Sequence, residues 1–251
     1  MNTRAWSYDL IADFYATDMG QSMPFDDVAF YRSFCAGRTG RVLELGCGTG
    51  RILLALIAAG VDAIGVDRSL PMLQRLRHDA AELALATPAV AQMDIDAIAL
   101  DGDFAVVLAP YSLITYVTDL GAARRLLSEL RALLTRDGVL ILDAFIPQVV
   151  AAYADFRTDY RRPHANGVLE RSKRIEVFGN GTNRIQRRYR WFGPDQALVD
   201  EIVTSETIRP YPPDLIANLA TDAGFTSAQW SFDYGATATS TDAQFASVVL
   251  R

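Results

Sequence analysis

The chain has 251 residues, half of them hydrophobic and 22% charged, with a formal net charge of -6. This composition fits one globular core with an insertion, and the acidic balance argues against a general nucleic-acid-binding protein. No apolar run reaches the roughly 18 residues of a membrane-spanning helix, and the N-terminus lacks a signal-peptide pattern. With only Cys35 and Cys47, one of them inside a glycine-rich stretch, a disulfide is not expected. We therefore expect a cytoplasmic protein.

Residues 1–36 are rich in aromatic side chains and are expected to form a helical lid. The apolar run that follows ends at Glu44 and continues into Gly46, Gly48 and Gly50, after which a helical pattern begins at once. This predicts a strand, a tight loop and a helix, with glycines that allow unusual backbone angles and close approach of a ligand. Read from Gly46, the dinucleotide fingerprint would place its last glycine at Arg51, so that fingerprint does not fit.

Strands and helices then alternate, which predicts a parallel sheet covered by helices on both faces. The expected elements are Val61–Asp67 (strand), Leu70–Leu85 (helix), Ala89–Asp94 and Phe104–Ala109 (strands), Leu120–Leu134 (helix) and Val139–Phe145 (strand). Asp137-Gly138 is expected to end the second helix.

The alternation then gives way to an antiparallel meander of three extended segments, Leu169–Phe178, Asn183–Phe192 and Leu198–Arg209. Asn180-Gly181 favours a two-residue hairpin turn between the first two. A helix over Pro212–Ala223 and strands over Phe225–Phe232 and Phe245–Leu250 are expected to close the fold. The predicted organisation is a helical lid (1–36), a core (37–146), an inserted antiparallel substrate cap (147–210) and the end of the core (211–251).

The glycine loop VLELGCGTGR resembles the first motif of the class I S-adenosylmethionine (SAM)-dependent methyltransferases, and the similarity extends over residues 41–145 and the closing strands. The resemblance implies an α/β, Rossmann-like sheet that is mostly parallel with its last strand antiparallel, here with an inserted antiparallel meander. It implies SAM as cofactor, S-adenosylhomocysteine (SAH) as product, and no metal.

Ligands of open α/β sheets bind outside the carboxyl ends of the strands. By resemblance, Glu44 organises the glycine loop near the methionine part of SAM, Asp67 holds the ribose hydroxyls and Asp94 meets the adenine amine. The predicted cofactor-binding residues are Tyr8, Tyr15, Glu44, Gly46, Cys47, Gly48, Gly50, Asp67, Arg68, Met72, Met93, Asp94, Ile95 and Ala109.

Plainer interpretations of some of these residues stay open. Asp67 could be a helix N-cap, and Met72 and Met93 could be ordinary core residues. Tyr8 and Tyr15 lie seven residues apart on one expected helix face, which suits either a contact with the cofactor or simple packing.

The sulfonium of SAM is already electrophilic, so alignment of the acceptor and exclusion of water can supply most of the catalysis. A general base is needed only for some acceptors, and the sequence offers Tyr15, Tyr111 and His164 as candidates, with a plain loop histidine as the alternative for His164. Tyr111 and Tyr116 are expected to line the acceptor site. The segment Leu108–Tyr111 lacks the Asp/Asn-Pro-Pro motif of enzymes that methylate DNA bases.

Residues 161–190 hold nine basic and two acidic residues, a net charge of +7. A two-residue turn would place Arg174 opposite Arg187, Lys173 opposite Arg188 and Arg171 opposite Arg190. Like charges directly opposite each other destabilise a sheet, so something must compensate.

Two explanations of this charge are open. The acids of the third segment, Asp200, Glu201 and Glu206, could lie beside the basic residues. Alternatively, arginines could bind an anionic acceptor, because their guanidinium groups suit carboxylates and phosphates. The predicted substrate-binding arginines are Arg161, Arg187 and Arg188.

Together these features predict a methyltransferase that acts on a small molecule of specialised metabolism, with N- and O-methylation both open and an anionic acceptor favoured by the arginines. No nucleic-acid or membrane partner is expected, and the protein is expected to be a monomer or homodimer. The alternatives are methylation of RNA or a peptide, and a non-catalytic SAM-binding module.

Overall fold

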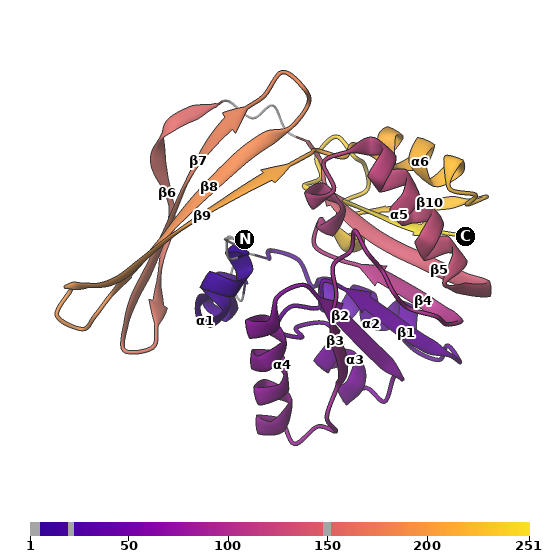
Figure 1. The fold of residues 1–251 in the computed structure, drawn as a ribbon, viewed down its shortest axis with the longest axis horizontal. Coiled ribbons are helices and arrows are strands. Elements are labelled where there is room, and N and C mark those ends of the chain that lie inside the picture. Colours follow the sequence, from indigo (N-terminus) through magenta and orange to yellow (C-terminus); the bar gives the residue numbers. More distant parts are fainter. Residues whose placement is uncertain (1–5, 20–22, 148–151) are drawn as a thin grey trace. The chain divides into compact units, whose positions relative to one another are not determined.

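A computed structural model describes residues 6–19, 23–147 and 152–251. The chain folds into two compact units (Figure 1). We call residues 25–147 and 210–251 the core unit, and residues 1–24 and 148–209 the inserted unit. The N-terminal segment that was expected to form one lid is divided between them. Helix α1 (Ser7–Met19) belongs to the inserted unit, and α2 (Asp27–Cys35) belongs to the core unit.

The core unit contains a seven-stranded sheet with the strand order β10-β11-β5-β4-β1-β2-β3. Strand β11 runs antiparallel to both of its neighbours, and the remaining pairs are parallel, as predicted for the fold class. The strands are β1 (Arg41–Leu45), β2 (Ala63–Asp67), β3 (Ala89–Gln92), β4 (Phe104–Ala109), β5 (Leu134–Phe145), β10 (Ala228–Phe232) and β11 (Phe245–Leu250).

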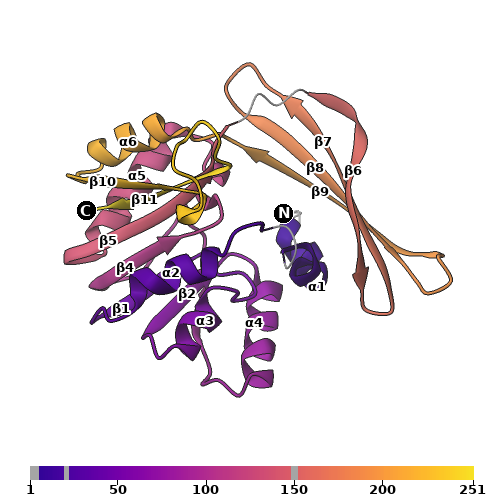
Figure 2. The same ribbon diagram turned by 180° about the vertical axis from the view of Figure 1, so that it is seen from behind.

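Two apolar clusters cover the two faces of this sheet. The cluster that includes Leu127 and Ile216 lies under α5 (Leu120–Ala132) and α6 (Pro213–Asp222), which are in front of the sheet in Figure 1. The cluster that includes Tyr31, Leu53 and Leu73 lies under α2, α3 (Leu53–Ala58) and α4 (Leu70–Glu82), and Figure 2 shows α2 and α3 from that side. Strands buried on both faces explain why the sequence shows short, continuous apolar runs.

Side-chain caps start the longer core helices. Ser69 accepts a hydrogen bond from the backbone N–H of Met72 at the start of α4, and Asp119 does the same for Ala122 at the start of α5. Helix α5 ends at Ala132, however, two residues before its predicted end at Leu134 and five residues before Asp137. The chain enters β5 at Leu134, and a Cβ atom on Gly138 would lie 2.7 Å from the Phe104 carbonyl oxygen. Gly138 therefore permits close strand approach, and the prediction that it ends the helix is wrong.

The inserted unit is a four-stranded antiparallel sheet, in the order β6-β7-β8-β9, with α1 packed on it. Its strands are β6 (Tyr153–His164), β7 (Gly167–Val177), β8 (Asn183–Phe192) and β9 (Leu198–Ile208). The last three were predicted, but β6 was not. Most of its side chains are exposed or half-buried, so it lacks the apolar alternation that identifies a strand.

The pairing of β7 with β8 differs from the prediction by one residue. Phe178 and Thr182 pair across a three-residue loop in which Gly181 has a φ of +79°. Arg171 therefore lies opposite Tyr189, and Arg174 lies opposite Gln186. A shift of one position changes every partner, so the three predicted pairs of facing cations are wrong. One other pair of cations lies directly opposite, Lys173 and Arg187.

Candidate functional site

The glycine loop joins β1 to α3 at the carboxyl edge of the core sheet. Gly46, Gly48 and Gly50 have φ angles of +63°, +53° and +86°, in the region that L side chains avoid. A Cβ atom on Gly46 would lie 2.9 Å from Leu113, and one on Gly50 would lie 2.7 Å from Leu76. The backbone angle therefore favours glycine at both positions, and at Gly50 the buried side chain of Leu76 would also have to move.

Asp67 ties the glycine loop to the end of β2. Its two carboxylate oxygens accept hydrogen bonds from the backbone N–H groups of Gly48, at 2.8 Å, and Ser69, at 2.7 Å. These two donors fix the orientation of the carboxylate. Ser69, not Asp67, is the side-chain cap of α4.

Glu44 lies beneath the same loop, and 2% of its surface is exposed. Burial, followed by the charges of Asp67 and Asp27, raises the pKa of Glu44 to about 8, against the opposing charge of Arg51. Its Oε2 atom has no hydrogen-bond partner within the part of the chain that the structure describes. An unpaired buried acceptor costs free energy, and the ammonium group of a bound amino acid moiety would satisfy it.

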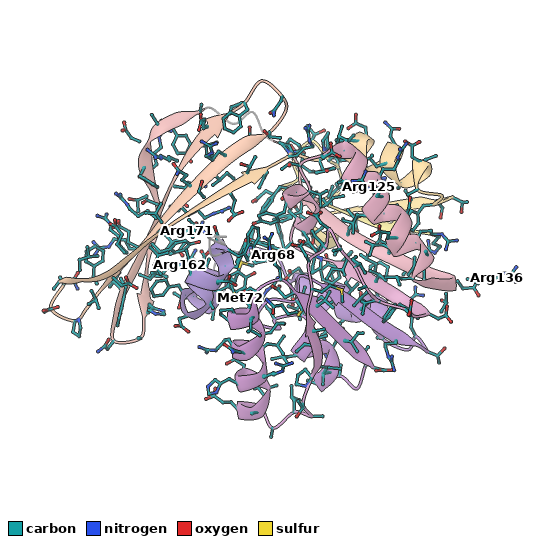
Figure 3. The ribbon with its side chains drawn as sticks, in the orientation of Figure 1. Arg68, Met72, Arg125, Arg136, Arg162 and Arg171 are labelled. Atoms are coloured by element: carbon teal, nitrogen blue, oxygen red, sulfur yellow. The ribbon has the colours of Figure 1, made fainter. Side chains whose placement is uncertain are left out.

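The predicted adenine-binding residues meet at the ends of β2 and β3. Arg68 and Asp94 form an ion pair with an Nε–Oδ2 distance of 3.3 Å, and the Met93 backbone N–H donates to the Asp67 carbonyl. Met93 and Ile95 are half-buried against the core. Met72 is buried, with 1% of its surface exposed, near the start of α4, where Figure 3 labels it with Arg68.

Cys47 follows Gly46 but points into the core. Its Sγ atom lies 2.7 Å from the position that a Cβ atom on Gly65 would take. Burial raises the pKa of the Cys47 thiol well above its ordinary value. Its backbone N–H donates to the Val66 carbonyl. Its carbonyl accepts from the Gly50 N–H, so Cys47 acts as a packing residue beneath the loop.

Beyond Ala109, at the end of β4, the chain makes a turn that also lies beside the glycine loop. Tyr111 and Ser112 have φ angles of +55° and +56°, and η1 (Leu113–Tyr116) follows. Leu113 packs against Gly46, so predicted residues Tyr111 and Tyr116 flank a segment in contact with the glycine loop.

A residue that the sequence analysis did not select holds this turn. Asp143, in β5, is fully buried and accepts hydrogen bonds from the backbone N–H groups of Tyr111 (3.0 Å) and Ser112 (2.6 Å). It also accepts from the hydroxyls of Tyr31 (2.5 Å) and Tyr234 (2.8 Å). The available signal was an acid inside the apolar run VLILDAF, because a buried carboxylate needs donors.

The remaining predicted site residues lie in the inserted unit. The rings of Tyr8 and Tyr15 meet edge to face on α1, with centroids 5.8 Å apart. His164 ends β6, where its Nδ1 lies 2.8 Å from the Thr17 hydroxyl and its ring contacts those of Phe14 and Trp191. Burial lowers the pKa of His164.

Many of the clustered basic side chains pair within the inserted unit. Arg171 bonds Asp18, with an Nη1–Oδ1 distance of 2.5 Å, and also Asp159, which in turn pairs with Lys173. Arg162 donates to the Asp18 carbonyl, and Figure 3 shows Arg162 and Arg171 beside α1. Further ion pairs of the stretch join Arg161 and Arg190 to Glu170, and Arg184 to Glu176.

The acids of these ion pairs come from α1, β6 and β7. The expected source was the third segment, and of its acids only Glu201 lies directly opposite a clustered arginine, Arg190. Arg187 and Arg188 are adjacent in β8, so they point to opposite faces of the sheet. Arg188 stacks on Phe156, 4.6 Å from its ring centroid, on the face away from Tyr189 and α1.

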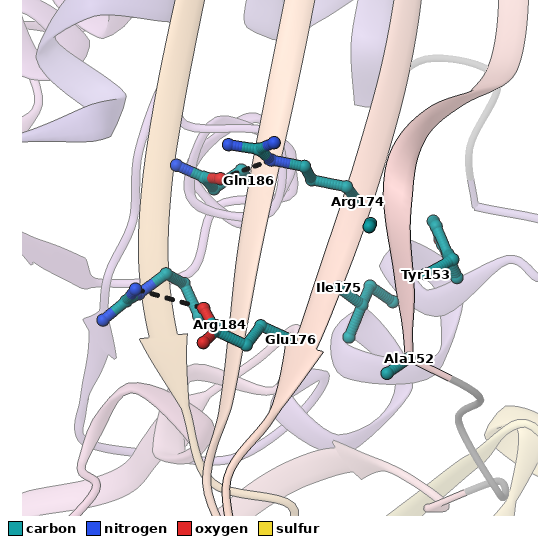
Figure 4. Close-up of a pocket in the computed structure, with 8 residues that line it drawn as sticks. Ala152, Tyr153, Arg174, Ile175, Glu176, Arg184 and Gln186 are labelled. Atoms are coloured by element: carbon teal, nitrogen blue, oxygen red, sulfur yellow. Dashed lines mark hydrogen bonds and ion pairs between the residues drawn. The ribbon is translucent and has the colours of Figure 1, made fainter.

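A cavity of about 650 Å³ lies at the end of this sheet where β6 departs from regular pairing with β7 (Figure 4). Tyr153 and Ile175 line it, together with two internally bonded pairs, Arg174 with Gln186 and Arg184 with Glu176. Its basic groups already have partners, so this cavity is a weak candidate for an anion site. Among the described residues, no helix is long and apolar enough to cross a membrane.

Three features together define the class I SAM-dependent methyltransferase fold: the order of the strands in the sheet, the glycine loop, and the acids at successive strand ends. Residues 42–138 match the family model of a methyltransferase domain, and the protein is a SAM-dependent methyltransferase containing that domain. The cofactor is SAM. The unpaired Glu44 oxygen and the fixed Asp67 carboxylate fit its methionine and ribose parts.

Solved structures share the fold of both units at low sequence identity. The CcbJ methyltransferase from Streptomyces caelestis is 21% identical, with a TM-score of 0.78 and 98% of each chain covered. The sugar N-methyltransferase KedS8 from Streptoalloteichus sp ATCC 53650 is 20% identical, with a TM-score of 0.74 and coverage of 100% of this chain and 96% of that one. CalS10, an amino pentose methyltransferase from Micromonospora echinaspora solved with SAM, is 18% identical, with a TM-score of 0.72 and coverage of 95% and 96%. A comparison with curated protein sequences gave no match.

Proposed function

We propose that this protein transfers the methyl group of SAM to a nitrogen or oxygen atom of a small molecule of specialised metabolism. The observation that carries the cofactor part is the fixed carboxylate of Asp67 between Gly48 and Ser69. The acceptor class is supported by the inserted antiparallel unit. The similarity to a sugar N-methyltransferase and to an amino pentose methyltransferase extends over nearly the whole chain and so includes this unit. An amine acceptor is favoured, because an amine that enters neutral needs no general base.

SAM supplies an electrophilic methyl group when bound. The chain's own contribution is to bind and orient. Asp67 is proposed to accept from the ribose hydroxyls, Asp94 from the adenine amine, and Glu44 from the methionine ammonium. Tyr111 is proposed to border the acceptor, whose alignment accounts for most of the rate.

An anionic group on the acceptor stays part of the proposal in a narrower form. Much of the positive charge of the stretch is used in internal ion pairs. Since Arg187 and Arg188 point to opposite faces, one of them, not both, would contact such a group.

The cofactor assignment is tested by SAH binding measured by isothermal titration calorimetry. Asp67→Asn keeps the shape but removes the charge, and hydrogen bonds to charged groups contribute about 1.5–3 kcal/mol. We expect SAH affinity to fall roughly 10- to 100-fold. Asp62→Asn is the matched control. Asp62 lies directly before the other end of β2 and forms an exposed ion pair with Arg41. Equal affinities for the two variants would contradict the assignment.

The acceptor class is tested by transfer of labelled methyl from SAM into an extract of the source organism, separated by size. Label in small metabolites supports the proposal and provides the acceptor for mass spectrometry. Label in RNA or protein would overturn it, and the basic stretch would then be a docking surface. Background turnover in all fractions, with SAH binding intact, would favour a non-catalytic SAM-binding module.

A further inference from the structure

Asp143 joins segments that are far apart in the sequence. Its carboxylate receives the Tyr31 hydroxyl from α2, the Tyr234 hydroxyl from η2 (Asp233–Gly235), and two backbone N–H groups from the turn after β4. Burial raises the pKa of Asp143, and these four donors act in the opposite direction. Asp143 is therefore a buried acceptor that is bonded to α2, to η2 and to the turn after β4.

The turn that it holds is conformationally costly. Tyr111 and Ser112 are consecutive non-glycine residues with left-handed backbone angles, and such residues cost of order 1 kcal/mol or more each. Both N–H groups point to the same carboxylate, so Asp143 stabilises the conformation that the side chains oppose. The Ser112 hydroxyl in turn accepts from the Phe145 N–H at 2.7 Å, which fastens the turn to the end of β5.

The turn fixes the Tyr111 ring at the cofactor edge of the sheet. The ring packs against Phe145 and Phe245, with centroid distances of 5.7 and 6.2 Å. Phe145 is 45% exposed, although it is large and apolar. Leu113, directly after the turn, packs on Gly46 of the glycine loop. The Tyr111 ring thus belongs to a partly exposed aromatic cluster, and the turn that carries it leads directly into Leu113 on the loop assigned to SAM.

We propose that Asp143 is a positioning residue for methyl transfer, which holds the left-handed Tyr111–Ser112 turn and thereby sets the place of the Tyr111 ring against the acceptor. This inference rests on the proposed function. The rival explanation is purely structural: Asp143 would anchor α2 and η2 through the two tyrosine hydroxyls, and the turn would follow passively. The proposal depends on the two backbone donors, whereas the rival explanation depends on the two phenol donors. Variants that remove one kind of donor can therefore distinguish them.

The first test is Asp143→Asn in the full-length protein. The amide retains one acceptor oxygen, and both phenols can accept from its NH₂ group, but its nitrogen cannot accept from a backbone N–H. We expect acceptor kcat/KM to fall roughly 10- to 100-fold, the scale of a misplaced reactive geometry. SAH affinity should change by less than about threefold, because Leu113 is held by the buried residues of η1 as well.

The second test is rescue by glycine. Glycine adopts the Ser112 backbone angle without steric cost, although Ser112→Gly also removes the acceptor for the Phe145 N–H. The comparison is therefore a double-mutant cycle. Ser112→Gly should lower activity in the wild-type background and raise it in the Asp143→Asn background. Additive effects would overturn the proposal.

The rival explanation is tested by Tyr31→Phe combined with Tyr234→Phe, which removes the phenol donors and keeps both backbone donors. We expect this pair to lower kcat/KM less than Asp143→Asn does. An equal or larger fall would support the anchoring explanation instead. Leu130→Ala, which opens a cavity under α5, controls for general destabilisation.

Exchange of the amide hydrogens of residues 111–114 gives a readout that needs no acceptor. Exchange should speed up in Asp143→Asn and slow again when Ser112→Gly is added. If the protein bound no SAH, the proposed function would fail, yet exchange would still decide whether Asp143 holds the turn. Unchanged exchange in Asp143→Asn would reject the positioning role whatever the activity.

Discussion

Three buried carboxylates differ in their hydrogen-bond donors: those of Glu44, Asp143 and Asp18. The number of donors affects how readily each carboxylate loses its proton. Asp143 has four donors, and Asp18 has an arginine and two phenols. Glu44, in contrast, has one oxygen without a partner in the described structure. A carboxylate that is buried but incompletely paired tends to hold its proton, and such groups are common at functional sites.

The protonation of Glu44 predicts how stability depends on pH. Its pKa is raised to about 8 in the folded protein, so the stability that it contributes is fully present below its ordinary pKa and is lost as pH rises through about 8. We expect the unfolding free energy of the SAH-free protein to fall by about 2 kcal/mol more between pH 6 and 8 than that of Glu44→Gln. Urea titrations at a series of pH values measure this difference. Parallel pH profiles for the two proteins would show that Glu44 is ionised in the fold.

At the scale of elements, helix α1 is held to the inserted sheet by polar as well as apolar contacts. Asp18, 5% exposed, accepts from Arg171, from the Tyr160 hydroxyl at 2.7 Å and from the Tyr189 hydroxyl at 3.2 Å. Phe14 stacks on the Tyr189 ring. The helix has no basic residue in its last turn, so these contacts supply the positive charge that its carboxyl end favours.

Asp18→Ala should therefore loosen α1. Removing one partner of a buried pair commonly costs about 3–5 kcal/mol, and Asp159 continues to pair with Arg171, so a loss of about 2–3 kcal/mol is expected. Hydrogen exchange of the α1 amides and urea unfolding measure the effect. Glu176→Ala is the control, because its pair with Arg184 is 45% and 58% exposed and should contribute less than about 1 kcal/mol. Equal losses in both variants would contradict a specific clamp.

The strand register gives a separate prediction for Arg187 and Arg188. The two side chains lie on opposite faces of the inserted sheet, so an anionic acceptor would contact one of them. We expect Arg187→Gln and Arg188→Gln to differ at least about tenfold in acceptor KM, which corresponds to one lost charge-assisted hydrogen bond. Two unchanged KM values would mean that the acceptor is not bound by these arginines.

At the scale of the whole molecule, the chain combines an acidic net charge with one basic stretch in the inserted unit. Within that unit five of the basic side chains, those of Arg161, Arg171, Lys173, Arg184 and Arg190, form ion pairs with Asp18, Asp159, Glu170 and Glu176. Because these ion pairs neutralise much of the local charge, the stretch differs from the unpaired basic surface that binds a phosphate backbone.

This arrangement predicts weak inhibition by polyanions. Heparin or unfractionated RNA should leave methyl transfer to the small-molecule acceptor largely unaffected at about 0.15 M salt. The check is an inhibition series at several salt concentrations. Strong inhibition that weakens steeply with salt would instead indicate a nucleic-acid partner.

The sequence alone determined the fold class and supplied the residues that are proposed to bind the cofactor. Apolar runs of strand length, alternating with helical periods, report directly on local backbone preference and burial. The glycine loop, Asp67 and Asp94 were selected as candidates because they follow strand ends, and strand ends of a parallel sheet meet at one edge.

Only the tertiary structure decided the partners across long separations. Asp143 lies 112 residues from Tyr31, and Asp18 lies 153 residues from Arg171, so no local pattern could pair them. Strand β6 was missed because its exposed polar side chains hide its periodicity. The β7–β8 register depended on one loop residue, and shifting a strand by one position exchanges its faces. Local sequence specifies which elements form, whereas pairing and side-chain partners depend on the packing of the complete chain.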